Sequence, residues 1–137
     1  MDAQSIMVNL MNRVLGIGGV FIKAKDPKKL QKWYEENLGI EPNYEGYIIF
    51  QWKDLGKKSG KAYTLWGLFP RNTDYFEPSE NPFMINFLVR DLDGLLKELR
   101  EKGVKVEDKI VEHQEGRFAW FIDPEGTKVE LWEPPND

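Results

Sequence analysis

The chain has 137 residues, of which 41% are hydrophobic and 13% aromatic, and 19 basic against 23 acidic residues give a net charge of −4. This length and apolar content suit one folded domain with a packed core and exclude an intrinsically disordered chain. The lack of cysteine excludes disulfides and thiolate chemistry, and a single histidine excludes sites built on several histidines. The mild acidity argues against a nucleic-acid partner.

The first 13 residues have no strong periodicity and are predicted to form an N-terminal extension, with a single domain over residues 14–135. No basic segment followed by an apolar run and a cleavage site is visible at the N-terminus. The longest uncharged stretch, from Ala3 to Asn12, is far shorter than the roughly 20 apolar residues that span a bilayer. We therefore expect a cytoplasmic protein without membrane contact.

The first half of the domain reads as strand, helix and two strands. A β-rich run over 17–24 is followed by Asp26 and Pro27, a capping residue and a proline suited to the first helical turn. Apolar residues at helical spacing then predict a helix over 27–38, with Gly39 as its stop. Strands are predicted over 44–53 and 61–69, separated by a glycine-containing turn, and residues 71–82 are predicted to be a linker.

The second half repeats this order. Residues 83–89 are predicted to be a strand, Asp91 caps a helix, and Leu92, Leu95, Leu96 and Leu99 form its apolar stripe. Gly103 ends the helix. Further strands are predicted over 104–111, 117–122 and 128–133, with a turn at 123–126 between the last two.

Four landmarks recur at a nearly constant offset between the halves: Asp26 and Asp91, Gly39 and Gly103, Gly60 and Gly126, and the Leu-Trp pairs at 65–66 and 131–132. This repetition predicts a duplicated βαβββ module, over about 14–70 and 82–135. Each half is too short to cover its own sheet face, so the two modules are expected to share one core. The predicted fold class is α+β.

Alternation along the strands separates two sets of side chains. One set is aliphatic and fits beneath the helices. The other mixes polar, small and aromatic side chains and is expected to line a cavity, the alternative being a solvent-exposed face. This second set comprises Gly19, Phe21, Thr64, Trp66, Met84, Asn86, Glu130 and Trp132.

The chain resembles the glyoxalase/bleomycin resistance/dioxygenase proteins, the vicinal oxygen chelate superfamily. The resemblance rests on the segment 18–39, with its Gly-Gly, Asp-Pro, Trp-Tyr and Leu-Gly pairs, and on the closing segments 116–120, 123–126 and 129–134. It implies paired βαβββ modules that form a cupped mixed sheet with both helices on the convex face. It also implies a ligand cavity inside the cup and a homodimer.

Metal-dependent members of this superfamily carry ligands on the first and last strands of each module. Those positions map here onto Gly19, Thr64, Met84 and Glu130. Glycine has no donor, threonine is a weak neutral ligand, and a thioether suits hard divalent ions poorly, which leaves one carboxylate where three or four donors are needed. We therefore expect no metal and no other cofactor. His113 lies outside the mapped positions and is read as a surface residue.

The leading prediction is a protein that binds a small organic ligand, with Gly19, Phe21, Thr64, Trp66, Met84, Asn86 and Trp132 around it. Glu130 has two interpretations. Burial in the cup would raise its pKa and suit it to act as the general base of a metal-independent lyase or isomerase. Alternatively, it is a structural residue paired with a neighbouring donor. A metal-dependent lyase or dioxygenase using Glu130 and His113 is the least favoured alternative.

Overall fold

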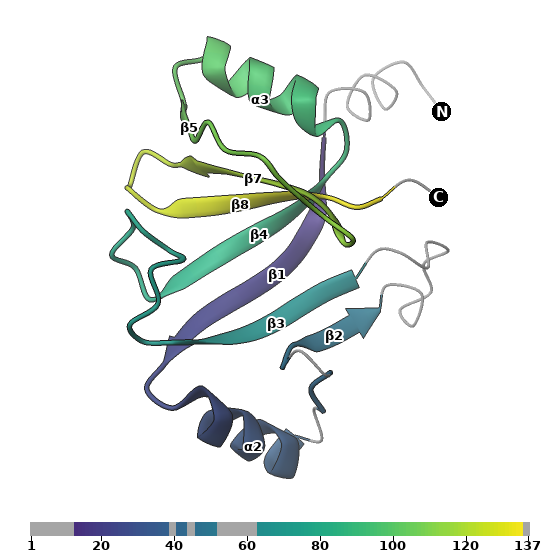
Figure 1. The fold of residues 1–137 in the computed structure, drawn as a ribbon, viewed down its shortest axis with the longest axis vertical. Helices are drawn as coiled ribbons and strands as arrows, with labels where there is room; N and C mark the ends of the chain where they lie inside the picture. The colour runs from purple at the N-terminus through teal and green to yellow at the C-terminus, as the bar shows by residue number, and fades with distance from the viewer. Residues whose placement is uncertain (1–12, 39–40, 44–45, 52–62, 136–137) are drawn as a thin grey trace, which may run out of the picture.

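A computed structural model describes residues 13–38, 41–43, 46–51 and 63–135. It contains an eight-stranded mixed sheet and two helices (Figure 1). The helices are α2 (Pro27–Leu38) and α3 (Leu92–Glu101). The strands are β1 (Val14–Ala24), β2 (Ile48–Gln51), β3 (Tyr63–Pro70), β4 (Phe83–Val89), β5 (Lys105–Val106), β6 (Val111–His113), β7 (Gly116–Ile122) and β8 (Lys128–Glu133). The predicted extension, apart from Arg13, lies outside the described residues.

The strand order makes the duplication visible. It runs β2-β3-β1-β4-β8-β7-β5, with β6 paired to β7. Within each half the opening strand pairs in parallel with the last one, β1 with β3 and β4 with β8. The halves join through the antiparallel pair β1 and β4 at the centre of the sheet. The predicted fold class, α+β with paired modules in one mixed sheet, is confirmed.

Both helices begin where the capping residues predict. The carboxylate of Asp26 accepts a hydrogen bond from the backbone N–H of Lys29 at 3.1 Å, and that of Asp91 accepts one from Gly94 at 3.2 Å. Helix α2 packs against β1 and β3, and α3 packs against β5 and β8, so the helices lie at opposite ends of the sheet (Figure 1). No helix within the described ranges is long and apolar enough to cross a membrane.

One core lies between α3 and the sheet. The leucines of the predicted stripe supply its helical side, with Leu92 and Leu96 buried and Leu95 and Leu99 packed at the margin. Strands β4, β7 and β8 supply the other side. The sheet residues of this core are those that alternate away from Glu130: Val89, Ala119, Val129 and Leu131.

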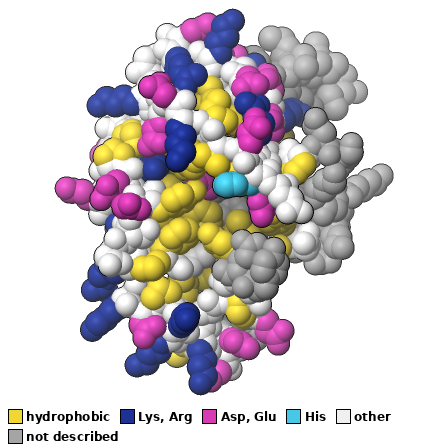
Figure 2. Space-filling model, viewed as in Figure 1, with side chains coloured by type: hydrophobic (Ala, Val, Ile, Leu, Met, Phe, Trp, Pro, Cys, Tyr) yellow, Lys and Arg dark blue, Asp and Glu magenta, His cyan; other side chains and the backbone are white. Residues whose placement is uncertain are grey.

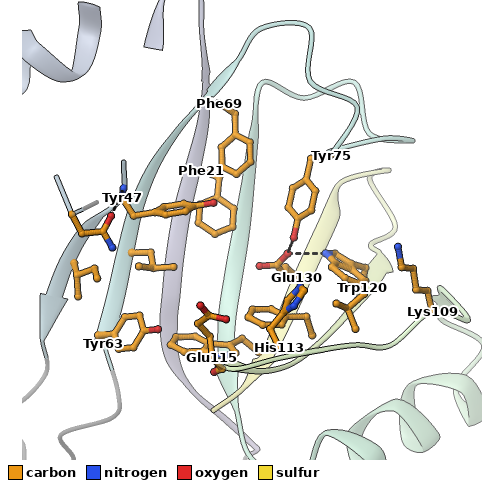
Figure 3. Close-up of a pocket in the computed structure, with 16 residues that line it drawn as sticks. Phe21, Tyr47, Tyr63, Phe69, Tyr75, Lys109, His113, Glu115, Trp120 and Glu130 are labelled. Atoms are coloured by element: carbon orange, nitrogen blue, oxygen red, sulfur yellow. Dashed lines mark hydrogen bonds between the residues drawn. The ribbon is translucent and has the colours of Figure 1, made fainter. Parts of the chain in front are cut away.

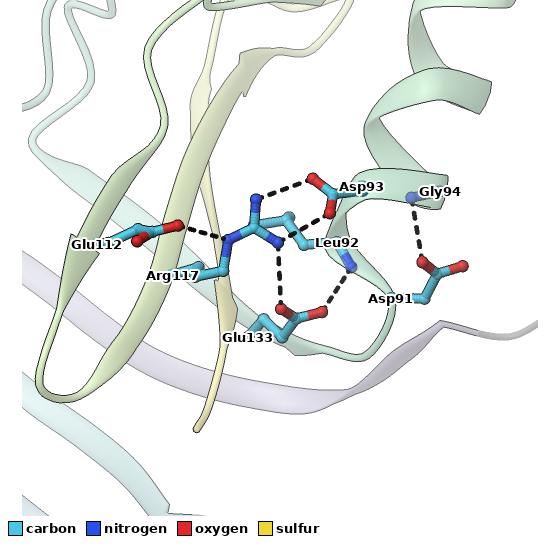
Figure 4. Close-up of polar contacts among 7 residues, drawn as sticks. All are labelled: Asp91, Leu92, Asp93, Gly94, Glu112, Arg117 and Glu133. Carbon is cyan, nitrogen blue, oxygen red and sulfur yellow. Dashed lines mark hydrogen bonds and ion pairs between the residues drawn. The ribbon is translucent and has the colours of Figure 1, made fainter. Parts of the chain in front are cut away.

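The β6–β7 hairpin is fastened to helix α3 through Arg117 (Figure 4). Its guanidinium donates to both carboxylate oxygens of Asp93, at 2.8 and 3.0 Å, and also pairs with Glu112 and Glu133. The pKa of Asp93 is lowered, chiefly by this hydrogen bond from Arg117. Glu133 in turn accepts from the backbone N–H of Leu92 at 2.8 Å. The hairpin, the last strand and the helix start therefore form one connected unit.

Of two sequence predictions about connections, one is wrong and one has the right bounds but misses the packing of the segment. The strand predicted over 104–111 is split into β5 and β6, because the chain leaves β7 after Val106 and rejoins it at Val111. The segment 71–82 connects β3 to β4 as predicted, but it is also packed onto the concave face of the sheet. Its Phe76 is fully buried against Phe21, Met84 and Trp120.

Candidate functional site

The concave face of the sheet encloses a cavity of about 770 Å³. Figure 2 shows hydrophobic side chains gathered across the middle of the molecule, with charged side chains mostly around them. The lining comes from both modules: Phe21, Asn43, Tyr47, Ile49, Tyr63, Leu65, Phe69, Tyr75, Lys109, Val111, His113, Glu115, Phe118, Trp120, Glu130 and Trp132. This volume lies within the range of small-molecule sites.

A row of paired residues across the sheet explains how the cavity floor is built. It runs from Ile49 through Leu65, Gly19, Asn86 and Glu130 to Trp120, one residue on each neighbouring strand. Residues paired in this way share one face of the sheet. The floor is thus apolar at its β2 end and polar at Glu130.

Glu130 is the centre of the polar part. Its side chain is 2% exposed and accepts three hydrogen bonds: from Asn86 Nδ2 to Oε1 at 2.6 Å, from Trp120 Nε1 to Oε2 at 2.8 Å, and from the Tyr75 hydroxyl to Oε2. Figure 3 shows the carboxylate between Tyr75 and Trp120. A buried carboxylate with three donors is held in one orientation.

Burial raises the pKa of Glu130, and the hydrogen bonds from Tyr75, Asn86 and Trp120 oppose that rise only in part. The pKa of Tyr75 is also raised, first by burial and then by the negative charge of Glu130. Tyr75 is therefore a neutral phenol that donates to Glu130. The predicted direction of the Glu130 pKa agrees with this geometry.

Lys128 contacts the backbone of Tyr75, the tyrosine whose hydroxyl donates to Glu130. Its Nζ donates to the backbone oxygen of Tyr75 at 2.9 Å and lies 3.5 Å from Glu107. The ammonium also lies over the rings of Tyr75 and Trp120, 5.6 and 5.5 Å from their centroids. Such cation–π contacts stabilise a desolvated ammonium. The cavity wall formed by Tyr75 is thus fixed at both its backbone and its hydroxyl.

Charged and polar side chains from the β5–β7 region lie at the edge of the cavity. Lys109, His113 and Glu115 line it, as Figure 3 shows in close-up, and all three are exposed to solvent. The Trp132 indole N–H donates to the backbone oxygen of Glu115 at 2.8 Å, which ties the turn between β6 and β7 to β8. These three residues form the polar rim of the site.

The predicted site residues fall into three groups. Phe21, Glu130 and Trp132 line the cavity. Gly19, Met84 and Asn86 share their face of the sheet but lie beneath the lining: a Cβ on Gly19 would meet the ring of Phe21 at 2.9 Å, Met84 is fully buried, and Asn86 is 1% exposed.

Thr64 and Trp66 lie on the opposite face of β3, and their expected placement on the cavity face is wrong. Leu65 pairs with Gly19 and so takes the cavity side. The ring of Trp66 contacts Tyr34 of α2, with centroids 5.6 Å apart, and the Thr64 hydroxyl donates to the backbone oxygen of Ile17. The error is a shift of one residue in the strand's phase, which moves every side chain to the other face.

Sequence reasoning missed most of the aromatic lining. Trp120 carried a readable signal: a turn centred on 123–127 pairs it with Glu130 across the hairpin. Tyr47 lies directly before β2, for which no phase was predicted, and Phe69 lies in β3, whose predicted phase was wrong. Tyr75 had no signal, because it lies in the segment interpreted as a linker.

The residues at the family's metal positions do not fit a metal ion. Of the four mapped positions, Gly19 has no side-chain donor, Met84 is buried in an aromatic cluster, and Thr64 is on the other face of the sheet. Glu130 is the one suitable ligand there. Across the described ranges, no group of three or more histidine and carboxylate side chains could share a metal ion.

Comparison with solved structures supports the same architecture. A variant of the methylmalonyl-CoA epimerase of Streptomyces coelicolor, in complex with 2-nitronate-propionyl-CoA, matches with a TM-score of 0.65 at 20% identity, covering 90% of this chain and 99% of the other. The methylmalonyl-CoA epimerase from Mycobacterium tuberculosis matches with a TM-score of 0.60 at 19% identity, covering 92% of each chain. At these identities the likeness shows the fold alone.

Sequence comparison identifies the family. A curated relative, the uncharacterized protein YraH of Bacillus subtilis (strain 168), is 27% identical over 116 residues, which are 80% of this chain and 91% of the relative. Residues 16–131 match the family model described as Glyoxalase/Bleomycin resistance protein/Dioxygenase superfamily. That match spans both modules and all the strands around the cavity, and the chain therefore belongs to the glyoxalase/bleomycin resistance protein/dioxygenase superfamily.

Proposed function

We propose that this protein binds a small organic molecule with a large apolar surface in the cavity of its cupped sheet, and that it does so without a metal ion. The observation that carries the proposal is the lining itself. Aromatic rings from both modules surround a space of about 770 Å³, and the few polar groups converge at Glu130 and at the rim. Mostly apolar walls with a few placed polar groups are typical of small-molecule sites.

The immobilisation of Glu130 supports binding over turnover. Its carboxylate already accepts from three protein donors and is almost fully buried. A general base must reach the proton that it removes and then release it. A carboxylate held in this way is better suited to shaping the cavity and fixing Tyr75 than to approaching a substrate carbon.

A blocked cavity tests this proposal. Ile49 lines the cavity from β2, and the adjacent Phe50 is 46% exposed on the other face. We expect the wild-type protein to bind the fluorescent probe 1-anilinonaphthalene-8-sulfonate saturably, one molecule per chain. Ile49→Trp should weaken binding at least ten-fold by filling the space, and Phe50→Trp should leave it unchanged. Non-saturable binding, or equal binding by both variants, would contradict a cavity site.

The alternative is a metal-independent lyase or isomerase in which Glu130 is the general base. It is favoured by one observation: burial raises the pKa of a carboxyl group on the cavity wall, which is how acid–base residues are tuned towards neutral pH. Glu130→Gln separates the two functions. Loss of turnover on a candidate substrate, with binding retained, would support proton transfer.

We also propose that the protein forms a homodimer. The support is family membership and the apolar face of β1 and β4 turned away from the cavity, where Ile17 and Phe83 are each 40% exposed. Light scattering coupled to size-exclusion chromatography should give twice the 16.0 kDa mass of one chain. A single-chain mass at micromolar concentration would contradict the proposal.

A further inference from the structure

We propose, building on the proposed function, that the cavity selects planar aromatic molecules carrying a hydrogen-bond donor, such as a phenolic hydroxyl or a ring N–H, and that the donor binds Oε1 of Glu130. Two independent features of the cavity lead to this proposal. The arrangement of the aromatic rings sets the shape of the ligand, and the unfilled acceptor position on Glu130 sets its polarity.

Two near-parallel ring pairs, one from each half of the lining, set the shape of the ligand. Phe69 and Tyr75 have centroids 5.6 Å apart with planes at 13°, and Phe118 and Trp132 have centroids 6.2 Å apart with planes at 3°. All four rings line the cavity. Offset and edge-to-face packing on such rings favours a planar aromatic guest over a puckered aliphatic one of similar volume.

The rings are held in place by contacts that do not involve a ligand. Tyr75 is fixed at its hydroxyl by Glu130 and at its backbone by Lys128. Trp132 is fixed through its indole N–H to the backbone of Glu115 and packs against Tyr63 with centroids 4.8 Å apart. A ring surface that is already ordered lowers the entropic cost of binding, so selectivity for planar guests is built into the unliganded protein.

The acceptor positions on Glu130 set the polarity of the ligand. A carboxylate offers about four lone-pair sites. Described residues fill three of them: Tyr75 and Trp120 occupy Oε2, and Asn86 alone occupies Oε1. One position on Oε1 is therefore left, on a side chain that contributes to the cavity wall. A ligand donor there would fill the fourth acceptor position of the carboxylate. An ether or carbonyl oxygen would instead be repelled, because two acceptors would face each other.

The neighbourhood of Glu130 favours a neutral donor over a cation. The ammonium of Lys128 lies over Tyr75 and Trp120, the two rings whose polar atoms contact Glu130, so positive charge is already supplied from behind the wall. Lys109 adds a second positive charge at the rim. A ligand ammonium would meet both, whereas a phenol or ring N–H adds no charge.

Matched ligands test both parts on the unmodified protein at pH 8, by competition against 1-anilinonaphthalene-8-sulfonate. We expect 2-naphthol to bind at least ten-fold more tightly than its methyl ether 2-methoxynaphthalene, because a charged acceptor strengthens the hydrogen bond. We also expect 2-naphthol to bind at least ten-fold more tightly than 2-decalol, which keeps the hydroxyl but is not planar. 2-Naphthol should also bind more tightly than 2-(aminomethyl)naphthalene, which is cationic. Equal affinity for 2-naphthol and the ether, or for 2-naphthol and 2-decalol, would overturn the inference.

Two variants assign the donor contact to Glu130. Glu130→Gln should reduce the preference for 2-naphthol over its ether to about three-fold or less, because the amide nitrogen at the position of Oε1 removes both the charge and the free acceptor, and affinity for the ether should not fall. Tyr75→Phe keeps the ring and frees a second acceptor position, so the preference should persist or increase. An undiminished preference in a folded Glu130→Gln protein would overturn the assignment. Saturable probe binding with no preference would leave the proposed function standing, whereas failure of the probe itself to bind would remove both.

Discussion

Replacing Glu130 with glutamine should make the folded protein more stable at neutral pH, by about 1–2 kcal/mol, because a buried charge is exchanged for a neutral group of the same shape. The carboxylate is 2% exposed, and burial is the largest cause of its raised pKa. The usual expectation for a polar-to-polar change in a hydrogen-bonded core is a loss of stability, so the sign of this effect is informative. Urea unfolding at pH 7.5 measures it.

The local hydrogen bonds can adapt to the glutamine. A side-chain oxygen at the position of Oε2 can still accept from Tyr75 and Trp120. An amide nitrogen at the position of Oε1 needs an acceptor, and Asn86 Oδ1 is buried without a hydrogen-bond partner among the described residues. Rotation of the Asn86 amide by half a turn would present that oxygen to the glutamine.

The stability that Glu130→Gln gains over the wild-type protein should depend on pH. Because the folded protein holds the Glu130 proton more tightly than the unfolded chain does, the unfolded chain loses it first as pH rises from the ordinary value of 4.5. The wild-type protein therefore loses stability as pH rises through the raised pKa, and the glutamine variant lacks this loss. The difference between the two should be smallest in acid, widen with pH and then level off. Glu125→Gln, at an exposed turn position, is the control. A difference that is constant with pH would contradict the assignment.

Gly116→Ala should destabilise the protein by about 3 kcal/mol or more. Gly116 begins β7 with a φ of +130°, a conformation that side-chain-bearing residues rarely adopt. An added Cβ would lie 2.2 Å from the backbone oxygen of Glu133, so the obstacle is main chain on the paired strand and cannot rotate away. Thermal and urea unfolding measure the loss.

Gly126→Ala is the matched control. Gly126 also has a positive φ, +85°, but a Cβ there meets nothing within 4 Å. It should cost about 1–2 kcal/mol from backbone strain alone. Equal losses in the two variants would mean that the clash with Glu133 is relieved by a shift of the strands. Because Gly116 follows Glu115 at the rim, Gly116→Ala should also weaken probe binding, and Gly126→Ala should not.

Much of the fold could be predicted because its signals are local and repeated. The caps at Asp26 and Asp91, the leucine stripe of α3 and the hairpin turn before β8 each depend on residues close in sequence, and each is found where expected. The duplication added a second constraint, since a pattern unclear in one half could be read from the other.

The site was harder to predict because it depends on strand phase and on long-range contacts. The phase of β3 could not be read from a stretch in which Tyr63, Leu65 and Trp66 are all apolar. A shift of one residue therefore placed the residues of the outer face in the cavity lining. The packing of Tyr75 onto Glu130 joins residues far apart in the chain, through a segment rich in turn-forming residues. Glu130 itself was identified because the family resemblance maps a ligand position onto it and because it lies between Val129 and Leu131 on a predicted inner strand.

The position of β1 at the centre of the sheet has a consequence for how the chain reaches this structure. Both of its partners, β3 and β4, come later in the chain, after α2 and β2. Strand β1 therefore leaves the ribosome before either of its partners has been made. Proteins dominated by such distant pairings fold slowly, so assembly of the β1–β4 junction is expected to limit the folding rate, and an unpaired β1 is the segment most exposed to aggregation in the nascent chain.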